Sequence, residues 1–420
     1  TVVSSFGAVT TSNENRMRTL VPQIRLGSPE LDNFKYNMQG GFAGPNARGA
    51  RGVVLPLDDD ATDAIREAIW RETLQRYEFA RNMYDQAKTR ATVSVEDEDK
   101  APCFSDAPMV RYYEAPLAAG RQKMDIKRAW EQRLNEVSAV FKTCPELSEG
   151  SASFSFQILR TYFVNSEGSL VVQNRVATRV MLMASLKAAD GMELPLNRDY
   201  FAYTPDDLPD NDRMIADARD MIKRLLALRD APVADPYTGP AILSGPASGV
   251  FFHEIFGHRL EGHRLKSGGQ TFKKMVGEQV LPVEFQVYCA PLLKRYADTD
   301  LYGHYVYDDE GVKARRVDNV VNGVLKEFLM SRVPLDGFPV SNGHGRASGG
   351  GDPVSRQSNL VIETAHPYTE SELRQMLIEE AKKQGKEYGY YFNAVTSGFT
   401  YTGEGGSLNS FNVTPLEVYR

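Results

Sequence analysis

The chain has 420 residues, of which 42% are hydrophobic and 25% are charged, and its formal net charge is -6 at pH 7. This composition is typical of a soluble globular protein, and a chain of this length usually divides into two domains because one core rarely grows beyond about 250–300 residues. The negative charge and the lack of a basic helix argue against nucleic acid as the main partner. No apolar run approaches the roughly 20 residues of a membrane-spanning helix, so we expect no membrane span.

The three cysteines, Cys103, Cys144 and Cys289, lie far apart in the sequence. They form neither a CxxC pair nor the dense spacing of a disulfide framework, so they do not identify the redox compartment. The sequence begins at Thr1 rather than Met, so a targeting segment is not excluded and the compartment stays open at this point.

Strands and helices are both expected before residue 150. Residues 1–27 predict two strands around the polar Ser-Asn-Glu-Asn turn at 12–15. Apolar residues at helical spacing predict a helix over about 60–88 and another over about 121–141. The stretch 91–108 has mixed charge, prolines and no period, which indicates an exposed connection.

The segment 151–204 is rich in alternating and β-branched residues. Turn signals at 165–168 and 190–191 divide it, which predicts strands joined by hairpins and an antiparallel sheet. A third helix is expected over about 210–228, and the Pro, Gly and Asp residues near 235 indicate a domain boundary.

We therefore predict an α+β fold with an N-terminal sheet-and-helix domain, 1–235, and a mostly antiparallel β domain, 236–420, that carries a functional helix. A continuous parallel sheet with a crossover helix between each pair of strands would contradict this prediction. The elements expected in the second domain are a short strand at 240–244, a hairpin at Asn322-Gly323, a long glycine-rich loop at 341–359, a helix from the capping box at 369–372 to about Gly385, and strands over 391–420.

Residues 251–263, "FFHEIFGHRLEGH", contain three of the six histidines. Pro246 follows Ser244-Gly245 and predicts the start of a helix that carries His253 and His258. On a regular helix two residues five positions apart lie about 140° apart, which would separate the imidazoles. A π-bulge, or a helix that ends near Gly257, would bring both to one metal ion.

Two neutral imidazoles suit Zn²⁺, which in catalytic sites takes three protein ligands and keeps a fourth position for water. Glu254, next to one histidine, would act as a general base that takes a proton from this water as it attacks a polarised carbonyl. The expected reaction is hydrolysis. In the alternative interpretation the histidines cap a helix end or contact solvent, and Glu254 lies favourably four residues before His258.

The segment "LSGPASGVFFHEIFGHRLEGHR" resembles the metal-binding segment of the TldD/PmbA family of metallopeptidases, whose catalytic members carry HExxxH. The resemblance extends over nearly the whole chain through "SFGAV", "RLGSPELDNF", "YFVNSEG", "ADGM", "LRDAP", "DDEGVKARRV" and "GHGRA…SRQSNLVIE", in the family's order. It implies a zinc-dependent peptidase with His253 and His258 as ligands and Glu254 as catalytic base. It also implies a cytoplasmic protein and a homodimer, or a heterodimer with a related subunit.

The third zinc ligand of the family is a cysteine in a C-terminal segment, whereas this sequence stops at "FNVTPLEVYR" and none of its cysteines has a matching context. One zinc ion per chain is expected, with the third protein ligand outside this sequence. Glu261 and His263 are the local substitutes, but we favour Glu261 as an orienting partner of an imidazole and His263 as a surface residue. His304, in a predicted strand, is expected to be packed or solvated.

The glycine-rich loop contains His344 and Arg346, which we expect to position substrate because glycines allow close backbone approach. The expected substrate is a peptide or unfolded protein, whose backbone would pair with a sheet edge near the site. The competing hypothesis is a non-catalytic regulatory or peptide-binding subunit of the same family with a vestigial metal site.

Overall fold

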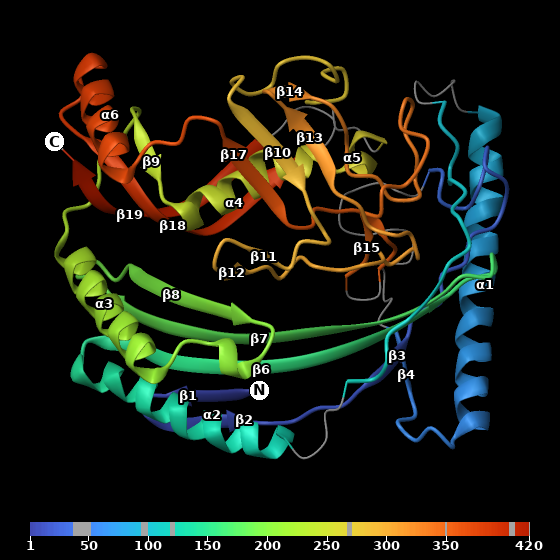
Figure 1. Ribbon diagram of the computed structural model, residues 1–420, viewed down its shortest axis with the longest axis horizontal. Coiled ribbons are helices and arrows are strands. Elements are labelled where there is room, and N and C mark those ends of the chain that lie inside the picture. The colour runs from blue at the N-terminus through green and yellow to red at the C-terminus, as the bar shows by residue number, and fades with distance from the viewer. Residues whose placement is uncertain are drawn as a thin grey trace.

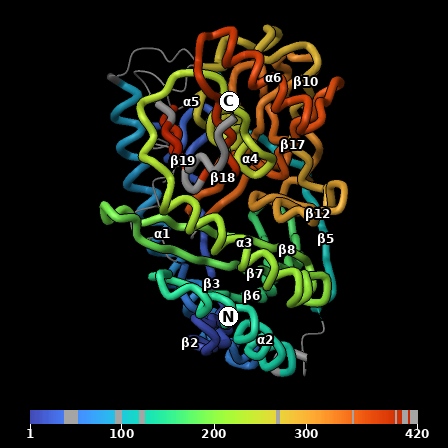
Figure 2. Tube along the Cα trace, turned by 90° about the vertical axis from the view of Figure 1, so that its left-hand side faces the viewer, coloured from blue at the N-terminus to red at the C-terminus, as the bar shows by residue number. Residues whose placement is uncertain are grey.

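The computed structural model describes residues 1–36, 52–93, 100–117, 122–266, 271–348, 351–402 and 408–419. Figure 1 shows two layers. A long curved sheet with helices on its outer side forms the first layer, and the C-terminal half of the chain lies over the opposite side of this sheet. In the turned view of Figure 2 the strands β6, β7 and β8 again lie below the C-terminal elements, and α1 stands to one side of these elements.

Within the described residues, six strands form the sheet of the first layer, in the order β2-β1-β6-β7-β5, with β8 also paired to β7. All of these pairs are antiparallel except the pair β5 and β7. The predicted hairpin turns at 165–168 and 190–191 are confirmed. The strands are β1 Val2–Ser5, β2 Ala8–Ser12, β5 Arg111–Tyr113, β6 Leu147–Val164, β7 Leu170–Lys187 and β8 Glu193–Ala202.

Two predicted helices, α2 (Gln122–Ala139) and α3 (Asn211–Asp230), cover one face of this sheet. The indole ring of Trp130 stacks on the ring of Phe154 with centroids 4.2 Å apart, which joins α2 to β6. The Asp210 carboxylate accepts the backbone N–H of Arg213 and so caps α3. The short 3₁₀ turn η1 (Val140–Thr143) follows α2, and η2 (Pro205–Asp207) precedes α3.

The longest helix, α1 (Thr62–Val93), stands at one end of the sheet and confirms the helix predicted over 60–88. The polar residues 12–15 lie between two strands as predicted, β2 and β3 (Arg18–Leu20), but these strands do not pair with each other. β3 pairs with β4 (Val53–Leu55), and β2 pairs with β1 across a turn at Phe6-Gly7 that was not predicted, where both residues have positive φ.

The connection predicted over 91–108 is not uniformly exposed. Its first residues continue α1, 94–99 lie outside the described residues, and Cys103 and Ser105 are buried. Burial of apolar atoms such as those of Cys103 offsets the conformational entropy that the segment loses when it is ordered.

The C-terminal layer holds a second sheet with the order β14-β13-β10-β17 among its described strands. A long hairpin of β18 and β19 lies beside it, and β9 joins β18 in parallel. The 3₁₀ turn η3 (Gly257–Leu260) and α5 (Gly262–Lys266) follow α4 (Gly245–Ile255), and α6 is Glu370–Lys383. The strands are β9 Ala241–Leu243, β10 Phe285–Cys289, β11 Arg295–Tyr296, β12 Thr299–Asp300, β13 Val317–Val321, β14 Val324–Leu325, β15 Gly345–Arg346, β16 Val354–Ser355, β17 Leu360–Thr364, β18 Gly389–Tyr401 and β19 Leu408–Tyr419.

In the C-terminal half, turn and capping residues predicted most of the local structure. The Asn322-Gly323 hairpin has positive φ at both residues, as a tight two-residue turn requires. Thr369 and Glu372 form the reciprocal bonds of the predicted capping box. The predicted glycine-rich loop, in contrast, contains the paired strands β15 and β16, and 349–350 lie outside the described residues.

The α+β fold class is confirmed, and none of the described helices is long and apolar enough to cross a membrane. The domain division at 235/236 stays a proposal. It is supported by two separate apolar clusters in the described residues: one draws its members from Val2 to Leu228, the other from Phe252 to Ile362.

A buried polar junction connects the layers. The side-chain amide of Gln173 on β7 donates to the Tyr307 carbonyl at 2.8 Å, and the Arg332 guanidinium pairs with Glu167 at 2.6 Å. Close by, Glu310 accepts the Arg332 backbone N–H at 2.6 Å, and Asp308 accepts backbone N–H groups, including that of Val312 at 2.8 Å. Burial raises the pKa of Asp308 to about 7 and, with the charge of Asp308, the pKa of Glu310 to about 8.

These raised pKa values predict a stability that falls with rising pH. An acid whose folded pKa lies above its unfolded value near 4 stabilises the fold below that value and loses this contribution as pH rises through the folded pKa. We expect Glu310→Gln to flatten the fall of the free energy of unfolding between pH 5 and pH 8, as measured by urea unfolding. Glu370→Gln, at an exposed position on α6, serves as the control. A Glu310→Gln slope equal to the parent's would contradict this account.

Candidate metal centre

The predicted helix of the histidine motif is α4, which packs against β18. The Ser244 hydroxyl accepts the backbone N–H of Ala247, and Pro246 lies in the first turn, so the helix begins as the sequence predicts. It ends at Ile255, and η3 begins at Gly257. Of the two devices that could bring the histidines together, the structure uses the helix end rather than a π-bulge.

Side chains from three other segments hold the last carbonyls of α4, which have no partner within the helix. The His253 carbonyl accepts a hydrogen bond from Gln357, the Glu254 carbonyl accepts one from Thr400 on β18, and the Ile255 carbonyl accepts one from Arg259. The break is therefore fixed by its surroundings.

This break brings His253, Glu254 and His258 together. One possible ligand atom from each residue lies within 4.8 Å of the others, and the two imidazole rings have centroids 4.6 Å apart. The Nε2 atoms of both histidines lie 3.6 Å from the Glu254 carboxylate oxygens. The side chain of His253 is 45% exposed, whereas that of His258 is only 6% exposed, so the group is open on the side of His253.

Glu261 orients His258 from behind. Its Oε2 lies 3.0 Å from Nδ1 of His258, and the fully buried carboxylate also contacts Arg264 at 2.6 Å and Arg356 at 3.5 Å. We assign the Nδ1 proton to this bond, which leaves Nε2 as a lone-pair donor toward Glu254 and His253. Burial alone would raise the pKa of Glu261, but the His258 bond and the charges of Arg356 and Arg264 together lower it below its usual range.

The surroundings of the two other histidines of this segment lower the pKa of each imidazole. Desolvation, and then the charge of His258, lower the pKa of His253, which favours the neutral imidazole that a metal requires. His263 is buried, so the expectation that it is a surface residue was wrong; burial lowers its pKa to about 4.

The side chain of Glu254 packs against Gly398 on β18. A Cβ at Gly398 would lie 2.9 Å from Cγ of Glu254 and 3.1 Å from the ring of Phe411, so the glycine lets the carboxylate lie against the strand. Sequence reasoning missed Gly398, Thr400 and Gln357, because nothing local in "TSGFT" or "SRQSN" indicates a contact with the motif more than a hundred residues away.

His344 and Arg346, the predicted substrate-positioning residues, have partners elsewhere. His344 is fully buried, its Nε2 lies 3.2 Å from the Ser358 hydroxyl, and burial lowers its pKa to about 4. Arg346 pairs with Asp309 at 3.0 Å and lies over the Tyr305 ring. Neither residue belongs to the His-Glu-His group. A substrate-positioning role for them stays a prediction, and the burial of His344 favours a structural role.

His304 lies in a turn rather than the predicted strand, with Nδ1 2.9 Å from the Pro291 carbonyl, and is packed as expected. All three cysteines are buried, and burial raises the pKa of Cys289 to about 12. None of them belongs to the His-Glu-His group.

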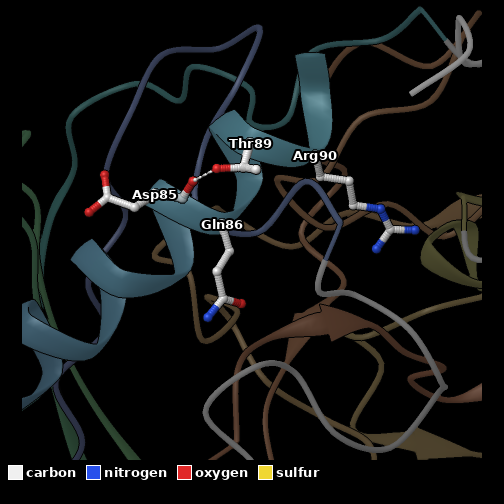
Figure 3. A pocket seen from close by; sticks show the side chains of 4 residues that line it. All are labelled: Asp85, Gln86, Thr89 and Arg90. Carbon is white, nitrogen blue, oxygen red and sulfur yellow. Dashed lines mark hydrogen bonds between the residues drawn. The ribbon is translucent and has the colours of Figure 1, made fainter. Parts of the chain in front are cut away.

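A surface hollow outside this group lies on α1, lined by Asp85, Gln86, Thr89 and Arg90 (Figure 3). The Thr89 hydroxyl there donates to the Asp85 carbonyl within the helix. The four side chains come from one stretch of helix and form no convergent set of catalytic groups.

The site lies in the part of the chain that a known protein family covers. The sequence model described as the PmbA/TldA metallopeptidase C-terminal domain matches residues 236–406, which include the whole His-Glu-His segment. Residues 236–406 therefore match the C-terminal domain of this family, and the comparisons support membership of the chain in the PmbA/TldD family.

Curated relatives carry metalloprotease names. The chain is 27% identical over 276 residues to Metalloprotease MJ0996 of Methanocaldococcus jannaschii, a match that covers 64% of this chain and 55% of the relative. It is 24% identical over 218 residues to the zinc metalloprotease TldD homolog of Saccharolobus solfataricus, covering 50% and 46%. The aligned part thus spans about half the length of these relatives.

Solved structures show the same fold. TldE from Thermococcus kodakarensis superposes with a TM-score of 0.53 at 16% identity, covering 87% of this chain and 79% of that one. A putative modulator of a DNA gyrase from Thermotoga maritima gives 0.52 at 17% identity, covering 81% and 73%. At these identities the likeness extends to the fold alone.

The buried charges around His258 predict a stability effect of Glu261→Gln that is independent of metal. The amide keeps the shape but removes the negative charge beside Arg264 and Arg356, and removal of one partner from a buried ion pair typically costs about 3–5 kcal/mol. Because a glutamine still accepts a hydrogen bond, we expect a loss of about 3 kcal/mol, by urea unfolding in EDTA. Glu363→Gln, whose carboxylate accepts tyrosine hydroxyls, is the control. Equal losses in both variants would argue against the role assigned to Glu261.

Proposed function

We propose that this chain is a zinc-dependent peptidase in which His253 and His258 hold the metal ion and Glu254 is the general base. The observation that carries the proposal is the His-Glu-His group with its buried orienting carboxylate, located in the segment that a metallopeptidase domain matches. The metalloprotease names of the relatives support the metal and the hydrolytic reaction.

The residues present fit a zinc ion. The two imidazole nitrogens of His253 and His258 are borderline donors of the kind that catalytic zinc sites use, and the ring of His258 is fixed by an acidic partner, as metal-ligating histidines usually are. By family resemblance the third ligand is a cysteine. A zinc ion bound here would polarise the scissile carbonyl and increase the acidity of a water molecule.

The protein's own groups would then perform the proton transfers. The Glu254 carboxylate, between the two imidazoles and 14% exposed, would accept a proton from the attacking water and deliver it to the leaving amine nitrogen. Gly398 and the Thr400 hydroxyl would keep this carboxylate and its backbone in place. Glu261 would hold the ring of His258 with Nε2 directed toward the ion.

A peptide or unfolded protein is the proposed substrate, because the group is open on the side of His253 and the relatives are named proteases. We further propose a dimer with a second copy or with a related subunit, for which the fold shared with a protein named TldE gives support.

One observation favours a second candidate, a non-catalytic subunit that binds a metal without hydrolysis. Oε1 of Glu254 lies 3.6 Å from Nε2 of His253, and Oε2 lies 3.6 Å from Nε2 of His258. The carboxylate could therefore itself be the third ligand of the metal ion. A ligated carboxylate cannot also act as a free base.

Glu254→Gln separates these roles. If Glu254 is the base, the variant keeps zinc and loses about 10²- to 10⁴-fold in peptide cleavage, the usual contribution of general base catalysis. His253→Ala and His258→Ala should lose zinc and cleavage together. Zinc content by plasma emission and cleavage of a peptide library would be measured side by side on the full-length protein. Cleavage by Glu254→Gln at the parent rate would contradict the proposed mechanism. Loss of zinc in this variant would favour the non-catalytic candidate.

A further inference from the structure

Gln357 spans the break between α4 and η3. Its Nε2 donates to the His253 carbonyl at 3.2 Å, on the helix side, and lies 3.4 Å from Nδ1 of His258, on the other side. One amide group therefore donates a hydrogen bond to His253 and lies beside His258, whose Nδ1 proton is given to Glu261, without lying among the proposed ligand atoms.

Gly257, at the break itself, makes this contact possible. A Cβ on Gly257 would lie 2.0 Å from Oε1 of Gln357 and 2.3 Å from its Cδ, closer than any side chain can approach. Gly257 is not among the glycines with positive φ, so its backbone conformation alone would accept alanine. The glycine is required by the close approach of Gln357 and not by the turn.

The position of the Gln357 side-chain amide reduces the stability of the fold. Oε1 of Gln357 is buried and has no hydrogen-bond partner among the described residues, a situation that typically costs about 1–3 kcal/mol. An apolar side chain of similar size would fill the same space without this cost. The N–H group that holds the last turn of α4 is what an apolar side chain could not supply.

We propose that Gln357 and Gly257 form a lock that sets the relative position of the two imidazoles, so that Gln357 is a positioning residue of the metal centre. This inference rests on the proposed metal site. Without the amide, the His253 carbonyl loses its partner and the last turn of α4 can move relative to His258. The donor atoms then no longer share one position for an ion.

Four proteins test the lock: the parent, Gln357→Ala, Gly257→Ala and the double variant. Zn²⁺ affinity is measured by competition with a chromophoric chelator, and the ligand geometry by the visible absorption of bound Co²⁺. We expect Gln357→Ala to weaken Zn²⁺ binding about 10- to 100-fold, the usual effect of removing an outer partner of a ligand, and to alter the Co²⁺ spectrum. Gln357→Met, which keeps the length but lacks the N–H, should do the same.

The double variant gives the sharpest outcome. If the added methyl of Gly257→Ala acts by displacing Gln357, the double variant binds Zn²⁺ no more weakly than Gln357→Ala alone. Losses that add, or an unchanged affinity and Co²⁺ spectrum in Gln357→Ala, would overturn the proposal. Gln375→Ala, at an exposed glutamine on α6, is the matched control and should match the parent.

Urea unfolding of the same four proteins in EDTA tests the lock separately from the proposed metal site. A parent that binds no zinc contradicts the proposed function. The urea midpoints in EDTA still decide the lock, because removal of Gln357 should relieve most of the destabilisation that Gly257→Ala causes. Additive shifts of the midpoints would show that the two residues do not act through each other.

Discussion

The proposed metal centre depends on one buried carboxylate. Glu261 is fully buried and yet stays ionised, because His258, Arg264 and Arg356 surround it. Burial of such a charge is expensive unless oppositely charged groups stay close to it, so this arrangement admits little movement of any member. The orientation of His258, the direction of its free nitrogen and the position of η3 all follow from it.

The rest of the architecture supports this arrangement from two sides. Strand β18 supplies Gly398 and Thr400 beneath Glu254, and the segment after β16 supplies Arg356 and Gln357 beside the histidines. The N-terminal sheet is joined to this half through polar contacts such as that between Glu167 and Arg332, and it contributes none of the metal-centre residues. The chemistry is therefore concentrated in the C-terminal layer.

The sequence was sufficient where structure is decided locally. Pro246 after Ser244-Gly245 predicted the start of α4, the capping box predicted the start of α6, and turn residues predicted the hairpins after β6, β7 and β13. The motif also predicted that His253, Glu254 and His258 come together, and their roles at a metal ion stay a proposal. The sequence was insufficient where a local signal was overruled: the first hairpin turns at Phe6, a residue that rarely takes positive φ, and His263 is buried although its neighbours are polar.

The remaining site residues could not be predicted because they meet the motif only in the folded chain. The hydrogen bond from Gln357 joins positions 104 apart, and that from Thr400 joins positions 146 apart. Spacing along a single sequence contains no information on such pairs.

The side-chain capping of the end of α4 has a consequence for the order of folding. A helix whose last carbonyls are held by a strand and a loop far along the chain cannot take its final end until both have docked, and contacts of this separation close late because of their entropic cost. Before that moment His253 and His258 have no fixed distance between them. The unfinished chain would thus hold a divalent ion only weakly, so that tight capture of the ion would mark the completion of the C-terminal layer.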